Sequence, residues 1–349
     1  MRGDDNPNSA NPILACPVKL RNPFSVEQLS FLSRLHSFAH LPMRRVEKRF
    51  IGKPAKRMMR LPHGCSWGDF RSSFKVDIQG VARTIVVNAR NLQFGALYQS
   101  QNRPVYEPET SALLDLLVGD GDVFFDIGAN WGYYSVLIAS RPGYCGHIKA
   151  FEPFPPTHQD LVGVVDQAGL ADTVACYSEA LSDHDDTGTM APWDGMQSGL
   201  ARLGPARDEN AGRQEVSVRR LDSLDVGFPD VIKIDVEDHE AEVFAGAEAT
   251  LQQAAPFIVF ENWLNKDRPE VTMEPYRVLS GHGCRFFVVG WAGDGEPRFC
   301  VPELPAPEGP TLALIPLEPD SRFFFAGQLN ILAVPPQRMD RLHEIFSPL

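Results

Sequence analysis

The sequence lacks an apolar run long enough to cross a membrane. Its longest apolar stretches are broken by a charge or a glycine well before the ~18 residues that a spanning helix needs. Residues 1–11 are polar and include two adjacent acids, so we also expect no secretory signal. With 43% hydrophobic residues the chain can still build a sizeable core, and its 349 residues predict roughly two domains.

Closely spaced cysteines are missing as well. The six cysteines lie no closer than sixteen residues apart, so the sequence contains no C-x-x-C metal or redox pair. A cytoplasmic, reducing location is therefore the expectation. Positive charge is also scarce: 33 Lys and Arg face 45 Asp and Glu, a net charge of −12, which argues against general binding of nucleic-acid backbones.

The exception is a basic block, which places eight cations between Arg44 and Arg60 with one opposing acid, Glu47. We expect a solvated face or a docking surface for an acidic partner, rather than a nucleic-acid site, because the remaining chain is strongly negative. The block lies in a predicted N-terminal accessory region, residues 1–104. There, apolar spacing predicts a helix near 26–40, and alternation predicts a strand pair that turns at Gln79-Gly80.

From residue 105 to 349 short apolar strands alternate with helical patterns, which predicts a doubly wound, seven-stranded, mostly parallel sheet. The expected strands are 123–127, 147–152, 173–177, 231–236, 257–261, 284–289 and 329–334, and the expected helices are 109–117, 133–139, 156–167, 239–251 and 273–281. Segments near 182–215 and 302–319 are too long and too rich in glycine or proline for ordinary connections. Each is expected to be a surface insertion or a wall over the ligand side of the sheet.

The strongest chemical signal is the turn F-F-D-I-G-A-N-W-G that follows the first of these strands. In an open α/β sheet the ligand crevice lies at the carboxyl ends of the strands. Gly128 permits the sharp turn, and Gly132 lets the next helix start close to a ligand. Asp126, at the strand end, suits a ligand with a positive or hydrogen-donating group rather than a pyrophosphate.

The next two strand ends also carry polar groups. Glu152 ends the second strand, where an acid can accept both hydroxyl protons of a ribose. The third strand runs into S-E-A-L-S-D at 178–183, whose polar edge would flank a purine. These three neighbouring strand ends predict a nucleoside site.

The same arrangement resembles the S-adenosylmethionine-dependent methyltransferases of the Rossmann-like class, and more narrowly the FkbM family. The resemblance covers about residues 104–334 and rests on several motifs in order, namely V-Y-E-P-E at 105–109, D-I-G-A-N-W-G at 126–132, A-F-E-P at 150–153, E-A-L-S-D at 179–183, R-L-D-S-L at 220–224, K-I-D-V-E-D-H-E at 233–240 and F-A-G-A at 244–247. It implies O-methylation of a hydroxyl on a sugar, a polyketide or a related small metabolite.

The resemblance also implies a donor site. The methionine portion would lie against the turn residues Asp126, Gly128, Ala129, Asn130 and Gly132, the ribose against Glu152, and the adenine edge against Glu179 and Ala180. One departure concerns position 238, where the family usually has glycine and this chain has aspartate. Asp238 is either a favourable acid near a helix start or a sign of an altered acceptor pocket.

Methyl transfer to an alcohol also removes a proton, which invites a general base. We expect that base to be His239, with Asp235 orienting it or the acceptor, and we expect the surrounding acids to raise the histidine pKa. Lys233, within a buried strand, must pair; Asp235 is the expected partner, and contact with an acceptor oxygen is the alternative.

Other functions fit the residues less well. An NAD(P)-dependent oxidoreductase would need G-x-G-x-x-G, but position 130 is asparagine and position 133 is not glycine. The phosphate-loop motif G-x-x-x-x-G-K-[ST] is absent from the sequence. A nucleoside-binding scaffold without catalysis stays possible, and the carboxylates at 235–240 permit a divalent metal, although no histidine pair supports a transition metal.

Overall fold

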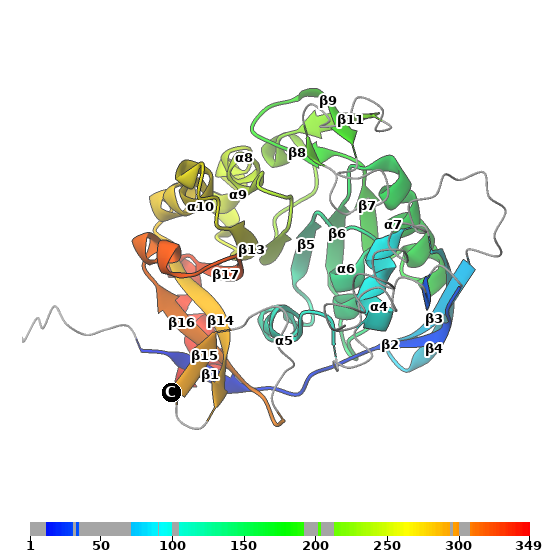
Figure 1. Ribbon diagram of the computed structural model, residues 1–349, viewed down its shortest axis with the longest axis horizontal. Coiled ribbons are helices and arrows are strands. Elements are labelled where there is room, and N and C mark those ends of the chain that lie inside the picture. Colours follow the sequence, from blue (N-terminus) through cyan, green and yellow to red (C-terminus); the bar gives the residue numbers. More distant parts are fainter. Residues whose placement is uncertain are drawn as a thin grey trace, which may run out of the picture.

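The computed structural model describes residues 12–30, 33–34, 71–89, 91–99, 105–191, 202–203, 213–293, 296–299 and 308–349. The predicted basic block, Arg44–Arg60, lies outside these residues. The fold is α/β, with an eleven-stranded main sheet and two smaller sheets (Figure 1). In the described part of the chain no helix is long and apolar enough to cross a bilayer.

All seven predicted strands are present, each within a few residues of its expected bounds. They are β5 (Val123–Ile127), β6 (His147–Phe151), β7 (Val174–Tyr177), β12 (Val231–Ile234), β13 (Phe257–Trp263), β14 (Arg285–Gly293) and β17 (Gln328–Val334). Numbered along the chain, they lie side by side in the order 3-2-1-4-5-7-6. The first five are parallel, and β17 runs antiparallel between β13 and β14. The order 3-2-1-4-5 is that of a doubly wound sheet, so the predicted fold class is confirmed.

The main sheet extends beyond these strands through chain segments from both ends. β16 (Thr311–Leu317) pairs with β14, β1 (Leu14–Pro17) pairs with β16, and β18 (Ser347–Pro348) pairs with β1, while β15 (Glu296–Phe299) also pairs with β14. All four pairings are antiparallel. Residues 311–317 of the predicted insertion at 302–319 are therefore a sheet strand, because β16 finds partners on both sides that satisfy its backbone.

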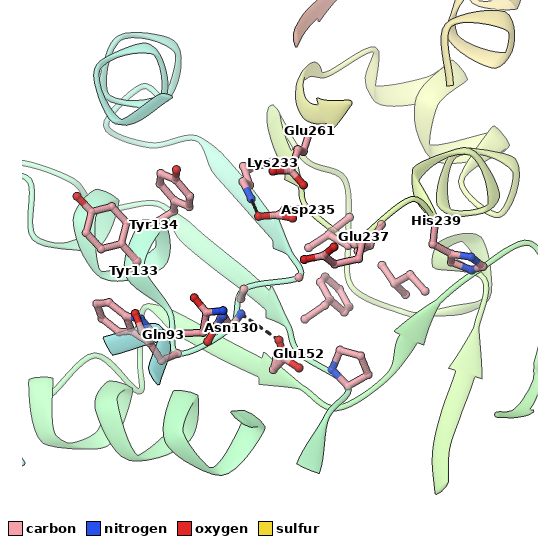
Figure 2. A pocket seen from close by; sticks show the side chains of 18 of the residues that line it. Gln93, Asn130, Tyr133, Tyr134, Glu152, Lys233, Asp235, Glu237, His239 and Glu261 are labelled. Carbon is pink, nitrogen blue, oxygen red and sulfur yellow. Dashed lines mark hydrogen bonds and ion pairs between the residues drawn. The ribbon is translucent and has the colours of Figure 1, made fainter. Parts of the chain in front are cut away.

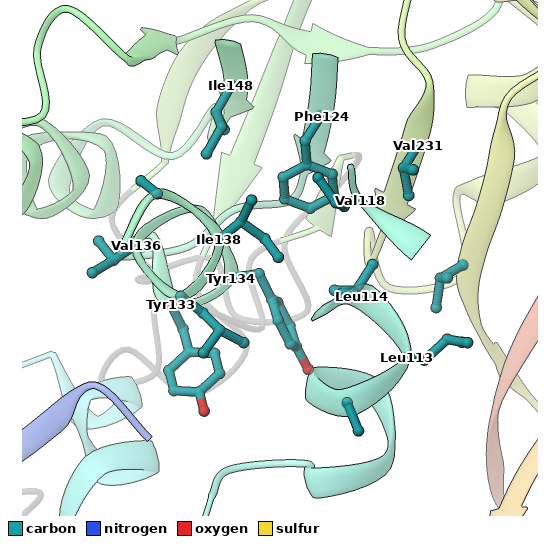
Figure 3. Close-up of a cluster of buried hydrophobic side chains, with 14 of the residues drawn as sticks. Leu113, Leu114, Val118, Phe124, Tyr133, Tyr134, Val136, Ile138, Ile148 and Val231 are labelled. Carbon is teal, nitrogen blue, oxygen red and sulfur yellow. The ribbon is translucent and has the colours of Figure 1, made fainter. Parts of the chain in front are cut away.

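Buried strands with apolar residues on both faces explain the layering. Phe124 and Val231 face one hydrophobic cluster, which includes residues of α5 (Pro108–Leu117), α6 (Tyr133–Ala139) and α7 (Pro155–Ala168) (Figure 3). Phe125 and Ile232 face the opposite cluster, with α8 (Glu240–Ala245), α9 (Glu248–Ala254) and α10 (Pro269–Gly281). Helices thus cover both faces, as parallel strands require. The described residues also form α4 (Gly95–Gln99), α11 (Met339–Ile345) and the short 3-10 helices 92–94, 221–223, 319–324 and 336–338.

The predicted helix at 26–40 is wrong at its start, where β2 (Phe24–Gln28) forms instead. Residues 33–34 are helical, and residues 31–32 and 35–40 lie outside the described chain. β2 pairs with β3 (Arg71–Ile78), which pairs with β4 (Val81–Asn88). Phe24 packs against Phe74 and Trp131, and this burial outweighs the local helical spacing. The hairpin turn predicted at Gln79-Gly80 is confirmed, with φ of 50° and 88°.

The segment near 182–215 contains strands as well. β9 (Asp186–Ala191) and β11 (Gln214–Arg219) pair with each other, and β10 (Arg202–Leu203) and β8 (Ala180–Leu181) flank them in a four-stranded sheet. In Figure 1 this sheet lies beyond the ends of the parallel strands. The predicted helix at 239–251 is divided into α8 and α9 at Gly246, where a side chain would meet the Ser182 carbonyl oxygen at 1.9 Å.

Candidate active site

A cavity of about 300 Å³ opens at the carboxyl ends of β5, β6, β12 and β13. Nine residues predicted from the sequence line it: Gly128, Ala129, Asn130, Glu152, Glu179, Ala180, Lys233, Asp235 and His239. The four-stranded sheet contributes Leu181 from β8 and Met190 from β9, so the segment near 182–215 forms part of the cavity wall. The strand ends thus converge as the doubly wound topology predicts.

The glycine turn owes its shape to a close approach between two strand ends. Gly128 has φ of +75°, and a Cβ there would lie 1.8 Å from the Asp235 carbonyl oxygen. The backbone N–H groups of Gly128 and Ala129 both donate to the Phe151 carbonyl, each at 2.9 Å. Only glycine fits this position, because any side chain would push the turn off the end of β12.

Glu152 is fixed by the same turn. The backbone N–H of Asn130 donates to Glu152 Oε2 at 3.0 Å, and that of Phe154 donates to Oε1 at 2.9 Å (Figure 2). Burial raises the pKa of Glu152 to about 7, although these two hydrogen bonds oppose the shift. The carboxylate keeps further lone pairs that can accept ligand hydroxyl groups.

Two predicted donor-site residues lie behind the cavity wall. Asp126 is fully buried, and its Oδ2 accepts hydrogen bonds from the N–H and the hydroxyl of Ser135, at 3.0 and 2.6 Å. This ties the end of β5 to the first turn of α6. Gly132 caps that helix with φ of +91°, and a Cβ there would meet Leu161 at 2.7 Å. Both residues shape the turn from within rather than line the cavity.

The predicted pairing of Lys233 with Asp235 is confirmed. Lys233 is 3% exposed, and its Nζ donates to Asp235 Oδ2 at 2.9 Å (Figure 2). The ammonium also lies 5.1 Å from the centre of the Tyr134 ring. Burial lowers the pKa of Lys233, but the carboxylates of Asp235, Glu107 and Asp126 outweigh it and raise the pKa to about 12. Lys233 is therefore a cation in a cavity dominated by acids.

Sequence reasoning missed the second half of this cavity. Tyr134 donates from its hydroxyl to Glu107 Oε2 at 2.6 Å. Glu261, at the end of β13, is 8% exposed and accepts from Trp263 Nε1 at 3.0 Å and from Gln328 Nε2. Because β17 runs antiparallel beside β13, Trp263 and Gln328 are direct partners across the two strands. The sequence signals for this half were the apolar strand that ends in acid at Glu261 and the V-Y-E-P-E motif that contains Glu107.

His239 differs from expectation in its electrostatics. Its Nε2 lies 3.0 Å from the Ser182 hydroxyl, and its Nδ1 lies 3.6 Å from Glu242 Oε2. Burial lowers the pKa of His239 despite the opposing charges of Glu242 and Asp183, so the predicted upward shift is wrong. In Figure 2 its ring points away from the Lys233–Asp235 pair. Its role as a base stays a prediction.

The carboxylates at 235–240 are not grouped for a metal. Within the described ranges, no three His, Cys, Asp or Glu side chains are arranged so as to hold an ion. Glu237 lines the cavity, whereas Glu240 is 4% exposed and accepts from the Val236 N–H at 3.2 Å. These acids therefore serve separate purposes.

Residues 126–280 match the family described as the methyltransferase FkbM domain, which confirms the resemblance predicted from the sequence. A hexuronic acid methyltransferase, AglP, from Haloferax volcanii is 29% identical over 157 residues, which are 44% of this chain and 61% of that protein. The chain thus spans about three fifths of the length of this curated relative.

The chain also shows a limited similarity to two solved methyltransferase structures. The methyltransferase FkbM of Methylobacillus flagellatus has a TM-score of 0.38 at 16% identity, covering 64% of this chain and 52% of that one. An S-adenosylmethionine-dependent O-methyltransferase of Thermotoga maritima has a TM-score of 0.37 at 13% identity, covering 93% of this chain and 92% of that one.

Proposed function

We propose that this chain, whose residues 126–280 match the methyltransferase FkbM domain, transfers the methyl group of S-adenosylmethionine to a hydroxyl of a sugar-type acceptor. One observation carries the proposal: the glycine turn after β5 and Glu152 at the end of β6 are joined by a hydrogen bond and line one cavity. A carboxylate at the end of the second strand can accept the hydroxyl groups of a ribose, and the resemblance to the FkbM family implies that the turn holds the methionine portion of the donor.

The residues present fit such a donor. Asn130 Oδ1 is a buried acceptor that has no hydrogen-bond partner among the described residues, and it suits a ligand ammonium. Glu152 would accept the ribose hydroxyls, and Glu179 with Ala180 would border the adenine. The cavity carries an excess of acids around a single lysine, which favours a positively charged ligand.

When bound, S-adenosylmethionine supplies an electrophilic methyl group on a sulfonium. The chain's own contribution is to hold the two reactants in line and away from water. Tyr134 and Glu107 are hydrogen-bonded to each other and line the cavity, and so do the paired Lys233 and Asp235. Asp235 is 36% exposed at its side chain, so it can accept a hydrogen bond from an acceptor hydroxyl.

A neutral sugar hydroxyl suits this half of the cavity better than an anion. Asp235, Glu237, Glu107 and Glu261 all line it, and Lys233 is already paired. Hydroxyl groups can donate to such carboxylates, whereas an acceptor carboxylate would meet like charge. The relative named for hexuronic acid supports a sugar, and the local charge favours neutral members of that class.

The test is a binding and transfer screen. Calorimetry should show one site for S-adenosylmethionine and S-adenosylhomocysteine, and weaker or no binding of NAD and NADP. Radiolabelled methyl transfer should then be measured to methyl glycosides of neutral hexoses and of uronic acids. Tighter binding of NAD would refute the proposal in favour of an oxidoreductase. Donor binding without transfer to any sugar would leave the scaffold alternative.

A further inference from the structure

Glu261 is held in a way that suits a carboxylate rather than a carboxylic acid. Both of its oxygens accept hydrogen bonds from neutral N–H donors, Trp263 Nε1 on its own strand and Gln328 Nε2 on β17. Hydrogen bonds that are donated to the oxygens of a carboxyl group favour its ionised form over its protonated form. The hydrogen-bond geometry therefore prepares a negative charge at Glu261.

The surrounding charges oppose that negative charge. Glu261 is 8% exposed, and the titratable groups that act on it from the packed elements are Lys233 on β12, Asp235 and Glu237 after β12, and Glu107 and Tyr106 before α5. Burial, and next the negative charge of Asp235, raise the pKa of Glu261 to about 10 against the attraction of Lys233. Glu261 thus holds a proton in the unliganded cavity although its hydrogen-bond donors favour the ionised form.

A positively charged ligand in the cavity would favour the ionised form of Glu261, as its hydrogen-bond donors do, against burial and the neighbouring acids. We propose that Glu261 is the catalytic base of this chain and that it becomes ionised only when the cavity holds the positively charged donor. The inference rests on the proposed function. A sulfonium charge in the same cavity favours the charged form of a nearby carboxyl group, as any opposite charge within a few ångströms does.

In the proposed step the methyl group moves from sulfur to the acceptor oxygen while Glu261 takes the hydroxyl proton. The acceptor oxygen forms its bond to the methyl carbon with a lone pair, the carbon–sulfur bond breaks with its electron pair going to sulfur, and the hydroxyl proton moves to the Glu261 carboxylate. The neutral thioether product removes the cation, which restores the conditions under which Glu261 keeps that proton. The base is thus active only while the donor is present.

The test compares two ligands that differ in charge. S-adenosylmethionine carries the sulfonium and S-adenosylhomocysteine does not, while both share the ribose and adenine. Calorimetric titrations at pH 8 in phosphate and in Tris, which differ in ionisation enthalpy, count the protons released on binding. We expect S-adenosylmethionine to release up to about one proton more per site than S-adenosylhomocysteine.

Two variants and a control test whether the additional proton that is released comes from Glu261. In Glu261→Gln the difference between the two ligands should vanish while both still bind, and the exposed control Glu274→Gln on α10 should keep it. Gln328→Leu removes one N–H donor to the carboxylate, so it should move the proton release to higher pH and serves as a second variant should Glu261→Gln fail to fold.

Equal proton release for the two ligands in the wild-type protein would overturn the inference, and so would an unchanged difference in Glu261→Gln. If neither ligand binds the wild-type protein, the proposed function fails instead, and the two failures are distinguished within one experiment.

Discussion

Glu152 makes donor binding depend on pH in a defined direction. Its pKa is about 7 in the unliganded protein because it is buried. Ribose hydroxyls donate best to the ionised form, so affinity should fall as pH falls through 7. About 90% of Glu152 is ionised at pH 8 and about 10% at pH 6, which predicts a rise in Kd approaching tenfold between these pH values.

S-adenosylhomocysteine is the suitable ligand for this measurement, because it has the ribose but no sulfonium charge to act on Glu261. Isothermal titration from pH 6 to pH 8 should show the rise in Kd for the wild-type protein. In Glu152→Gln the Kd should be at least about tenfold higher at pH 8, since a charge-assisted bond contributes roughly 1.5–3 kcal/mol, and the pH dependence should disappear. Glu215→Gln, at an exposed position on β11, is the matched control.

Folding stability responds to Glu152 with the opposite sign. A carboxyl group whose pKa is raised by folding contributes stability below its unfolded pKa of about 4.5, and this contribution is lost as pH rises through 7. The thermal shift produced by S-adenosylhomocysteine should nevertheless grow from pH 6 to pH 8, because its Kd falls over this range. A flat Kd across this range in the wild-type protein, or unchanged affinity in Glu152→Gln, would show that Glu152 does not hold the ribose.

Three further predictions concern other parts of the fold. Gly128→Ala should abolish donor binding and lower the free energy of unfolding by at least about 2 kcal/mol, because its Cβ would meet the Asp235 carbonyl. The control Gly163→Ala, in open space on α7, should raise the free energy of unfolding by about 0.5–1 kcal/mol; both are measured by denaturant unfolding. Arg322→Met should lower the free energy of unfolding by roughly 3 kcal/mol, since it removes four hydrogen bonds of a fully buried guanidinium. The control Arg277→Met, at an exposed side chain, should change it by no more than about 0.5 kcal/mol. Similar melting temperatures of the two variants would contradict this prediction. His239→Ala should lower turnover less than about tenfold if Glu261 takes the proton, and a loss of ~10²–10⁴ would return that role to the histidine.

The donor half of the cavity could be predicted from the sequence because its residues follow consecutive strands. Strands β5 and β6 are parallel neighbours, so the turn at Gly128 and the acid at Glu152 must end at one edge of the sheet. The acceptor half depends on long-range pairing. Gln328 reaches Glu261 only because β17 enters the sheet between β13 and β14, and no local pattern reveals that position.

The difference between local patterns and long-range contacts also explains which sequence predictions were wrong. β1 and β16 pair across about three hundred residues, and the spacing that predicted a helix at 26–40 contains no information about β3. The pKa of His239 was expected to rise because acids adjoin it in sequence. Its actual direction follows from burial, which only the folded chain decides.

Asp238 shows how a departure in sequence can preserve a conformation. Glu237 and Asp238 have φ of +58° and +70°, so the chain adopts two consecutive left-handed residues between β12 and α8. Glycine adopts this conformation without strain, and aspartate is among the few other residues that tolerate it. Asp238 is also not one of the described residues that line the cavity, whereas Glu237 is. Asp238 therefore has a backbone conformation that glycine also favours, and the acceptor half of the cavity is lined by Glu237 and Glu261 and not by position 238.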